Sequence, residues 1–519
     1  MTTTALLARD ITIVKSVILD EVSIEFDRLF QSAEAGASPR TLELDLWNLL
    51  LDVGRLILAV LFATLCRNAT ETALRTRGLD PSRASLRLDE DYWNTLMTTV
   101  GPVRFPVFAY RDRSMGVSST TRAPAREQVF PLHRHCRSSE LCLEWEAKLG
   151  SEHPFRTAQA ALTYFTHGAV KLEDNTIARH MVVVGSMVDP DWLYRPKNQI
   201  RELLRTRATR NAETNQPIIY ASSDAHALRR YVDDTWAAPW KMANGLRLWC
   251  VDWRTGAVIH LGGEFTWGDC HEVHRIIQRL IASGHLPPDG DYGDGVVASI
   301  AWVVDGMPWF KDYILSLYPD ALNILDAYHA KEKIGKLGAA LFGKGSKKAR
   351  AFYATARKAL LGTRRRPACK PKPRKGHKKR ARAKTWALKQ DADRRRVRKL
   401  TTAAEPLLKV LRELNVPQDK VDLREDLIHY VENNAYRMDY SRYQQLGYQI
   451  GSGAMESLHR VASQLRMKRP GPGWLPETAQ AIFNLRMLAL VGRWDEFWNQ
   501  PDLEHHLSEA FRVVPGVHS

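Results

Sequence analysis

The chain has 519 residues, of which 44% are hydrophobic, and it carries a formal net charge of +17. This length predicts three or four domains of about 150 residues each, and the apolar content excludes a wholly disordered chain. The excess of 75 basic over 58 acidic residues favours a polyanionic partner such as nucleic acid. A membrane surface is less favoured, because the sequence offers no amphipathic or lipidated anchor.

The cysteines and the N-terminal sequence indicate the compartment. Six cysteines without a CxxC pair are typical of a reducing environment rather than of a disulfide scaffold. The N-terminus lacks the charged and then apolar pattern of a signal peptide. The most apolar stretch, Leu56–Cys66, is too short to span a bilayer and is interpreted as part of a buried helix. We therefore expect a cytoplasmic protein.

The first third of the chain is expected to be mainly helical. Residues 1–100 have helical spacing, residues 102–110 are expected to be extended, and residues 112–140 have the polar composition of a loop. Two helices with a short connection, around 154–168 and 174–185, predict a helix-turn-helix. Plain packing explains such a helical pair equally well. If it reads DNA, the outward face of the second helix carries Thr176, Arg179 and His180.

From residue 217 the pattern changes to an α/β unit with a mixed sheet. It predicts three strands, a helix, a strand, a helix and a last strand, in this order: 217–224, 245–253, 256–265, 269–286, 297–306, 307–319 and 321–330.

Three acidic residues in this part of the chain are candidates for chemistry. Asp224 and Asp305 end apolar strands, where a sheet presents side chains to a cleft. Glu456 lies in the first turn of a helix that follows Gly451-Ser452-Gly453. Each also has a plain interpretation as a turn former, a cap or a partner of the helix dipole. Together, three hard oxygen donors suit two Mg²⁺ or Mn²⁺ ions rather than zinc.

Several phrases in this region resemble one family, the ISKra-type insertion-sequence transposases of the broader DDE class. The phrases are WVVDGMPWF, YPDALNILDAYHAKEKI, IGSGAMES, RMKRPGPGW and RWDEFW, and they lie between about 290 and 500. The resemblance implies a ribonuclease H-like core that a helical insertion interrupts before the last acid. It places the family's second acid on Asp305, its final glutamate on Glu456 and its first acid on Asp224.

The first acid departs from the family's pattern. The family usually has Asp-Gly there, whereas this chain has Asp224-Ala225-His226, and Asp233 and Asp234 lie close enough in sequence to be alternatives.

The patterns along the chain, together with the resemblance, predict a domain order. It runs from a mainly helical N-terminal DNA-binding region through a helix-turn-helix-like segment, the first part of the core, a basic helical insertion and the last part of the core to a C-terminal tail. The expected boundaries are 1–150, 151–210, 215–335, 336–445, 446–500 and 501–519.

Two basic segments are expected to contact DNA. The tract 364–384 suits sequence-independent phosphate contact, which depends strongly on salt. The loop after the Glu456 helix is expected to grip a DNA end, with Lys468 and Arg469 on the backbone and Trp474 stacked on a base. Trp474 is alternatively a core residue that anchors the next helix. The cations of the tract that we assign to DNA are Arg364, Arg365, Arg366, Lys378, Lys379 and Arg380.

Two further clusters receive minor roles. Asp326 and His329 are a possible ligand pair, but the resemblance places Asp326 beside the three acids rather than among them. Cys136 and Cys142, with His133 and His135, lack the usual spacing of a zinc site, and we interpret them as the remnant of a cysteine-containing element of the family.

The sequence therefore predicts a transposase that uses two Mg²⁺ or Mn²⁺ ions to cleave double-stranded DNA at element ends and to join them to target DNA. We expect it to act as a homo-oligomer on DNA, in the bacterial cytoplasm and associated with the nucleoid. Two alternatives stay open: a structure-selective DNA nuclease on the same core, and a catalytically decayed DNA-binding protein.

Overall fold

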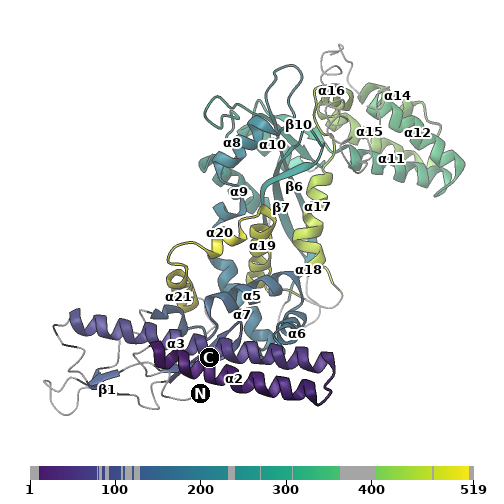
Figure 1. Ribbon diagram of the computed structural model, residues 1–519. Coiled ribbons are helices and arrows are strands. Elements are labelled where there is room, and N and C mark those ends of the chain that lie inside the picture. Colours follow the sequence, from purple (N-terminus) through teal and green to yellow (C-terminus); the bar gives the residue numbers. More distant parts are fainter. Residues whose placement is uncertain are drawn as a thin grey trace. The chain divides into compact units, whose positions relative to one another are not determined.

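The structure is a computed structural model, which describes residues 11–76, 78, 80, 85–87, 93–106, 109–111, 120–121, 129–231, 240–268, 270–306, 308–362, 404–469 and 473–513. The chain divides into two compact units (Figure 1). Unit 1 comprises residues 1–189 and 494–519, and unit 2 comprises residues 190–493. Residues 494–500 thus belong to unit 1, although we expected them in the core.

Unit 1 begins with two long helices that pack against each other, α2 (Ile11–Glu34) and α3 (Pro39–Thr76). The apolar stretch Leu56–Cys66 lies within α3, as expected, but only one of its faces is buried. Ala59, Ala63 and Cys66 are buried, whereas Leu61 is 52% exposed. Among the described residues, α3 is the one helix long and apolar enough to cross a membrane, a test that core helices also pass.

The expectation of helix up to residue 100 is wrong at its end, where the chain forms a hairpin. Its strands are β2 (Trp93–Thr98) and β3 (Gly101–Pro106). Gly101 makes the turn with a φ of 106°, and the Thr98 hydroxyl donates a hydrogen bond to its carbonyl oxygen at 2.8 Å. Leu96, Val103 and Phe105 pack on α3. A second small sheet contains β1 (Ser85–Arg87), β4 (Ala109–Arg111) and β5 (Thr120–Thr121).

The other described elements of unit 1 are helical, and they include residues up to Val513. Residues 501–513, which we expected in a tail, mostly form a helix whose Leu507 and Phe511 are fully buried, and this helix packs on the segments around Pro131 and His180. The elements are η3 (Pro131–Arg134), α5 (Glu140–Glu152), α6 (Phe155–Phe165), α7 (Asp174–Met187), α20 (Trp494–Trp498) and α21 (Leu503–Val513).

Unit 2 is built on a five-stranded mixed sheet with the order β10-β9-β6-β7-β8. The first three strands in sequence are antiparallel, and β9 and β10 continue the sheet in parallel beside β6. This order and these directions define the ribonuclease H-like fold, so the expected fold class is confirmed. The strands are β6 (Ile218–Arg229), β7 (Trp240–Val251), β8 (Val258–Trp267), β9 (Ser299–Val304) and β10 (Leu322–Leu325). The helices between them and before them are η4 (Pro190–Leu193), α8 (Lys197–Thr206), α9 (Cys270–Ala282) and α10 (Pro308–Leu317).

A helical insertion follows β10 directly, nine residues before the boundary at 336 that we expected. Its buried residues form one continuous core with the sheet, in which Ile324 and Val303 pack together with Leu407 and Val431. Figure 1 shows its helices grouped beyond β10. The basic tract 364–384 lies outside the described residues. The insertion comprises α11 (Ala327–Phe342), α12 (Lys347–Leu361), α14 (Ala404–Arg412), η5 (Gln418–Lys420), α15 (Val421–Asn434), η6 (Ala435–Arg437) and α16 (Tyr440–Gln445).

After the insertion the chain returns to the sheet as one long helix that changes its winding. The segments are α17 (Gly453–Leu458), the π-helical turn η7 (His459–Gln464) and α18 (Leu465–Met467). α17 contacts β6 and β7, and the last core helix, α19 (Pro476–Val491), packs on β8.

Gly245 lets α17 approach the sheet. It lies on β7 directly opposite Asp224 of β6. A Cβ atom built at Gly245 would lie 2.5 Å from the Phe265 ring and 2.6 Å from the end of the Met455 side chain. Both of these side chains are fully buried. The missing side chain therefore leaves room for Met455 of α17 and so sets how close the helix lies to the strand.

We expect Gly245→Ala to lower the free energy of unfolding by about 1–3 kcal/mol, because the added methyl group overpacks a filled core. Thermal unfolding of the purified chain measures this loss. Gly453→Ala is the matched control, since a Cβ there meets nothing within 4 Å. A Gly245→Ala variant as stable as the control would contradict this role.

Candidate metal site

The strand register brings two acidic residues together at the carboxyl ends of β9 and β10. Ala221 of β6 pairs with Trp302 of β9, and Val304 pairs with Leu325 of β10. Asp305 and Asp326 directly follow the paired ends of β9 and β10, whereas β6 and β9 pair only as far as Ala221, three residues before Asp224. The Asp326 amide donates to the Val304 carbonyl at 2.8 Å, which extends the ladder in this direction. Neighbours in register on parallel strands point to the same face, so the carboxylates of Asp305 and Asp326 are expected on one face.

The expectation that Asp224 ends its strand is wrong, because β6 continues to Arg229. β9 pairs with β6 only as far as Ala221, and from there β7 alone continues the pairing. The edge of β6 next to Asp224 is therefore open to side chains from elsewhere in the fold. This open edge gives Asp224 the partial exposure that we expected from a strand end. Asp233 and Asp234 lie outside the described residues.

Glu456 reaches the same face from α17. The chain enters this helix through Ser452, whose carbonyl accepts hydrogen bonds from the amides of Met455 and Glu456 at 2.6 and 3.1 Å. Met455 points into the core, and Glu456, the next residue, is exposed. The expected first-turn position of Glu456 is confirmed.

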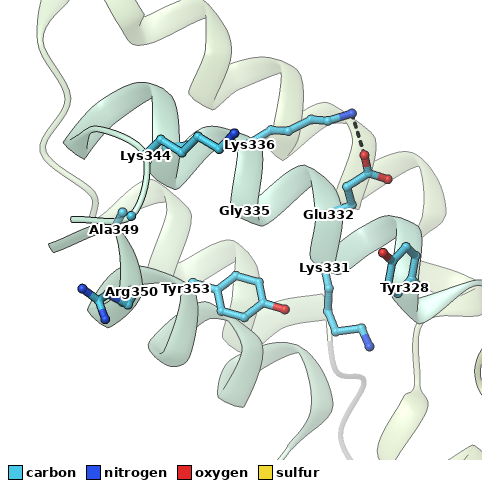
Figure 2. A pocket seen from close by; sticks show the side chains of 11 residues that line it. Tyr328, Lys331, Glu332, Gly335, Lys336, Lys344, Ala349, Arg350 and Tyr353 are labelled. Carbon is cyan, nitrogen blue, oxygen red and sulfur yellow. Dashed lines mark ion pairs between the residues drawn. The ribbon is translucent and has the colours of Figure 1, made fainter. Parts of the chain in front are cut away.

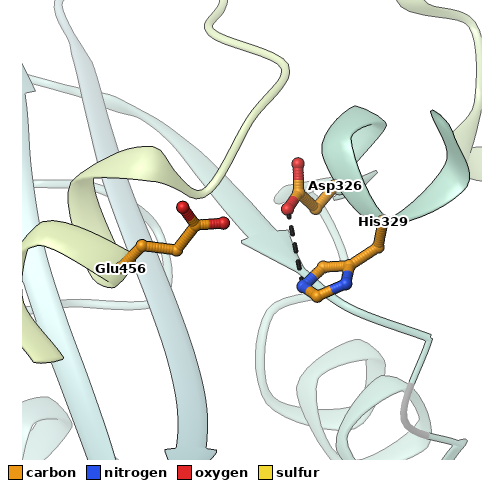
Figure 3. Close-up of side chains that lie close together, drawn as sticks. All are labelled: Asp326, His329 and Glu456. Atoms are coloured by element: carbon orange, nitrogen blue, oxygen red, sulfur yellow. Dashed lines mark ion pairs between the residues drawn. The ribbon is translucent and has the colours of Figure 1, made fainter. Parts of the chain in front are cut away.

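Asp326, His329 and Glu456 form the one group of potential metal ligands found among the described residues. One ligand atom from each lies within 4.8 Å of the other two. Figure 3 shows Glu456 pointing toward Asp326 from α17, with His329 on the first turn of α11. An Asp326 oxygen lies 3.8 Å from His329 Nε2.

Asp326 lies closer to the centre of the acidic group than the sequence indicated. It is fully buried and caps α11, and one of its oxygens accepts a hydrogen bond from the Tyr328 amide at 2.8 Å. Its other oxygen accepts from the Ser452 hydroxyl at 2.7 Å. The signal that could have revealed this position is its place at the end of the strand next to Asp305, because parallel strands align their carboxyl ends.

The electrostatics agree with a crowded group of carboxylates. The pKa of Glu456 is raised by partial burial of its carboxyl group and then by the negative charges of Asp326 and Asp224, against the opposing effect of His329. Burial also raises the pKa of Asp224, and Asp326 adds to the rise, while a hydrogen bond from the Ala225 amide and His329 oppose it. These acids therefore lie within each other's electric field.

Two buried histidines hold the helix beside Asp224. His226 lies on the same face of β6 as Asp224. Its Nδ1 atom is 2.5 Å from Nδ1 of His459, and its Nε2 atom is 2.7 Å from the hydroxyl oxygen of Ser463. His459 Nε2 lies 3.6 Å from an Asp224 oxygen. Burial lowers the pKa of His226 to about 3 and that of His459 to about 4, so both rings are neutral at pH 7. The π-helical turn presents these partners, and such turns are frequent at functional sites.

Trp474 is a core residue, so its expected stacking on DNA is wrong. Its side chain is 6% exposed, and its indole NH donates to the Met467 carbonyl at 3.0 Å. Its backbone amide donates to the Arg229 carbonyl at 3.0 Å and extends the end of β6. The Arg466 guanidinium stacks on its ring at 4.9 Å. Lys468 and Arg469 are exposed, as DNA contact requires.

The outward face predicted for the second helix of the helical pair is partly wrong. Thr176 and Arg179 of α7 are partly exposed and lie 3.3 Å apart, hydroxyl to guanidinium. His180 is 7% exposed, and its Nδ1 lies 2.6 Å from a carboxylate oxygen of the fully buried Glu146. A buried imidazole that is engaged in this way cannot read base edges.

The two cysteines of unit 1 lie beside this pair. Cys136 Sγ is 3.7 Å from His180 Nε2, and Cys142 Sγ is 3.7 Å from Glu146. Both thiols are buried, and burial raises the pKa of Cys142 well above its usual range. His180 and Glu146 are thus polar neighbours of these cysteines.

The donors at the sheet fit a hard divalent cation. The aspartates and Glu456 supply carboxylate oxygens, which Mg²⁺ and Mn²⁺ prefer, and no cysteine side chain is described among them. Carboxylates whose pKa values are raised by one another are also a group that a cation would stabilise. The site therefore fits the metal expected from the sequence.

The comparisons with known proteins add little. No protein-family model matches the sequence, and no curated protein matches it significantly. Among solved structures, the chain is similar to the Drosophila P element transposase strand transfer complex, at 12% identity over 68% of this chain and 92% of that chain. The TM-score of 0.28 is too low to carry an argument, so the fold assignment rests on the strand order.

We expect Glu456→Gln to raise the melting temperature of the metal-free protein by a few degrees at most, because solvent screens this carboxylate. The pKa of such a carboxyl is higher in the folded than in the unfolded protein. Its ionisation therefore costs no stability below the unfolded pKa, and the cost grows as the pH rises to the folded pKa. At pH 7 the substitution removes that cost. Unfolding in EDTA and then in Mn²⁺ is the measurement, and Mn²⁺ should stabilise the wild-type protein more than the variant.

Glu477→Gln is the control for that experiment. Glu477 also lies in the first turn of a helix, α19, but outside the acidic group, so its loss should slightly lower the melting temperature. Equal shifts for the two variants, or no response of the wild-type protein to Mn²⁺, would contradict a metal-binding group at Glu456.

Trp474→Ala should lower the free energy of unfolding by about 3–5 kcal/mol, the usual cost of truncating a buried tryptophan. Chemical denaturation measures it, with Leu475→Ala as the neighbouring control, since Leu475 is 45% exposed. An unchanged denaturation midpoint for Trp474→Ala would contradict its role in the core and would support the expected stacking on DNA.

Proposed function

We propose that the chain is a DDE-type transposase, which cleaves DNA at the ends of a mobile element and joins them to target DNA. The observation that carries the proposal is the meeting of acids from two core strands with a glutamate on the helix that follows the insertion, in a ribonuclease H-like fold. The resemblance of the sequence motifs supports the same family. The one group of potential metal ligands found among the described residues, Asp326, His329 and Glu456, contains the glutamate of this arrangement.

Asp224, Asp305 and Glu456 are the proposed metal ligands. Two Mg²⁺ or Mn²⁺ ions bound there would supply Lewis acidity to the attacking and leaving oxygens of phosphoryl transfer. The protein contributes rigid placement: β6 fixes Asp224, the end of β9 fixes Asp305, and α17 fixes Glu456. No covalent link between protein and DNA is part of the proposal.

Asp326 is better suited to positioning than to holding metal by itself. Both of its oxygens already accept hydrogen bonds, from the Tyr328 amide and from the Ser452 hydroxyl, and it is fully buried. Its charge still acts on Glu456 and Asp224. We therefore keep Asp305 in the ligand set and assign to Asp326 the placement of α17 and His329.

The remaining contacts follow from the charge of the chain. Lys468 and Arg469, exposed at the end of the helix that carries Glu456, are proposed to hold the DNA backbone near the acids. Thr176 and Arg179 of the helical pair are proposed to contact DNA bases. The tract 364–384 is proposed to contact DNA independently of its sequence. The proposed setting is a homo-oligomer on double-stranded DNA in the bacterial cytoplasm.

Asp305→Asn and Glu456→Gln should each reduce cleavage by about three orders of magnitude, since each removes several kcal/mol of transition-state stabilisation. DNA binding should be largely retained, because phosphate contacts carry it. The substrate is a labelled duplex containing the DNA that flanks the chain's own gene, with Mg²⁺ or Mn²⁺ and a target plasmid. Cleavage and joining are scored separately on gels.

Asp320→Asn is the control, because Asp320 is an exposed acid of the same unit. Normal cutting by either site variant would refute the ligand assignment. Cutting by the wild-type protein without joining would indicate a nuclease, and binding without cutting would indicate a decayed DNA-binding protein. Either result would overturn the proposed function.

A further inference from the structure

We infer that a basic hollow between α11 and α12 binds the phosphate backbone of the DNA strand that leaves the acidic site. The inference deepens the proposed function and rests on it. The hollow measures about 750 Å³ and is lined by one face of α11, the loop after it and the first turns of α12 (Figure 2).

The shape of the hollow comes from small residues. Gly335 and Ala339 of α11 and Ala349 of α12 line it, and a Cβ on Gly335 would lie 3.9 Å from the Tyr353 ring. Because the side chains at these positions are short, they leave the space between α11 and α12 open. A concave surface with a small-residue floor lets a polymer backbone approach the helices closely.

The charge of the hollow is strongly positive. Four cations and one carboxylate line it, an excess of three positive charges: Lys331, Lys336, Lys344, Arg350 and Glu332. Glu332 pairs with Lys336 at 2.8 Å. Among the described residues, Lys331, Lys344 and Arg350 have no ion-pair partner. Three unpaired cations around one hollow suit a polyanion rather than an acidic side chain or a neutral ligand.

Helix α11 connects the hollow to the acids. Asp326 caps this helix and His329 lies in its first turn, while Lys331 and the hollow follow on the next turns. Tyr328, in the first turn of the same helix, lines the hollow and is 57% exposed, with Lys331 Nζ 5.7 Å from its ring centre. The helix has 16 residues and is therefore about 24 Å long. A strand held at the acids can thus continue along α11 over several phosphates.

The alternating aromatic and basic side chains favour a nucleic acid over other polyanions. Tyr328 and Tyr353 offer ring faces on which bases can stack, and the lysines offer contacts to phosphates. These contacts carry no sequence information, so the hollow is expected to bind any sequence.

The test is a double variant, Lys331→Gln with Lys344→Gln, in the full chain. Binding to a fluorescent duplex with a single-stranded extension is measured over a series of salt concentrations. The slope of log affinity against log salt should fall by about two, and affinity near 0.15 M salt should fall by about tenfold or more. The matched control is Lys348→Gln with Lys358→Gln, an equal charge change at exposed positions of α12 outside the hollow.

A second measurement guards against an effect of misfolding. A photoreactive benzophenone amino acid in place of Tyr353 should crosslink to the DNA, and the same group in place of Lys348 should not. Equal slopes for the two double variants, or equal crosslinking at the two positions, would overturn the inference. If the wild-type protein still cleaves DNA and Glu456→Gln abolishes that cleavage, the proposed function is supported even when the inference about the hollow fails. The failure of the inference is therefore distinguishable from the failure of the proposed function.

Discussion

The site depends on a short contact where the helical insertion leaves the core and returns to it. The chain leaves at Asp326 and comes back at Ile450, and the Ala327 amide donates to the Ile450 carbonyl at 2.9 Å. Two residues later the Ser452 hydroxyl donates to Asp326 at 2.7 Å. These bonds tie the two ends of the insertion together. They fix the start of α17, and with it Glu456, relative to the strands that carry the other acids.

This placement is held against electrostatic repulsion. The pKa values of Glu456 and Asp224 are both raised, partly by Asp326, so the ionised group opposes its own assembly. Several neighbouring contacts are apolar or neutral: Met455 packs near Gly245 and Phe265, and two neutral imidazoles lie beside Asp224. Packing and hydrogen bonds therefore keep the carboxylates together without cancelling their charge. That leaves the charge available for a cation.

The sequence predicted the elements of the core well and individual side-chain surroundings less well. Strands and helices in unit 2 have strong periodicity and clear turn residues, so their order and a mixed sheet followed from the pattern. The ribonuclease H-like class followed from the resemblance of the motifs. Asp224 was misplaced because β6 continues as a strand after its partner β9 ends, which depends on pairing rather than on local sequence. Trp474 and His180 have polar groups that suggest binding, but Met467 and Glu146 satisfy those groups inside the fold.

The same reasoning explains why Asp326 stood out only in three dimensions. In the sequence it is one acid in a phrase that also contains a helix cap and a histidine, and capping does account for one of its oxygens. The other oxygen bonds to Ser452, which is 126 residues away, and no local pattern encodes that contact. Its position then joins two surfaces through one helix: α11 starts at the acids and continues past Lys331 along the hollow. A rigid helix transmits any shift at one end to the other, so the geometry of the acids and the path offered to DNA are set together.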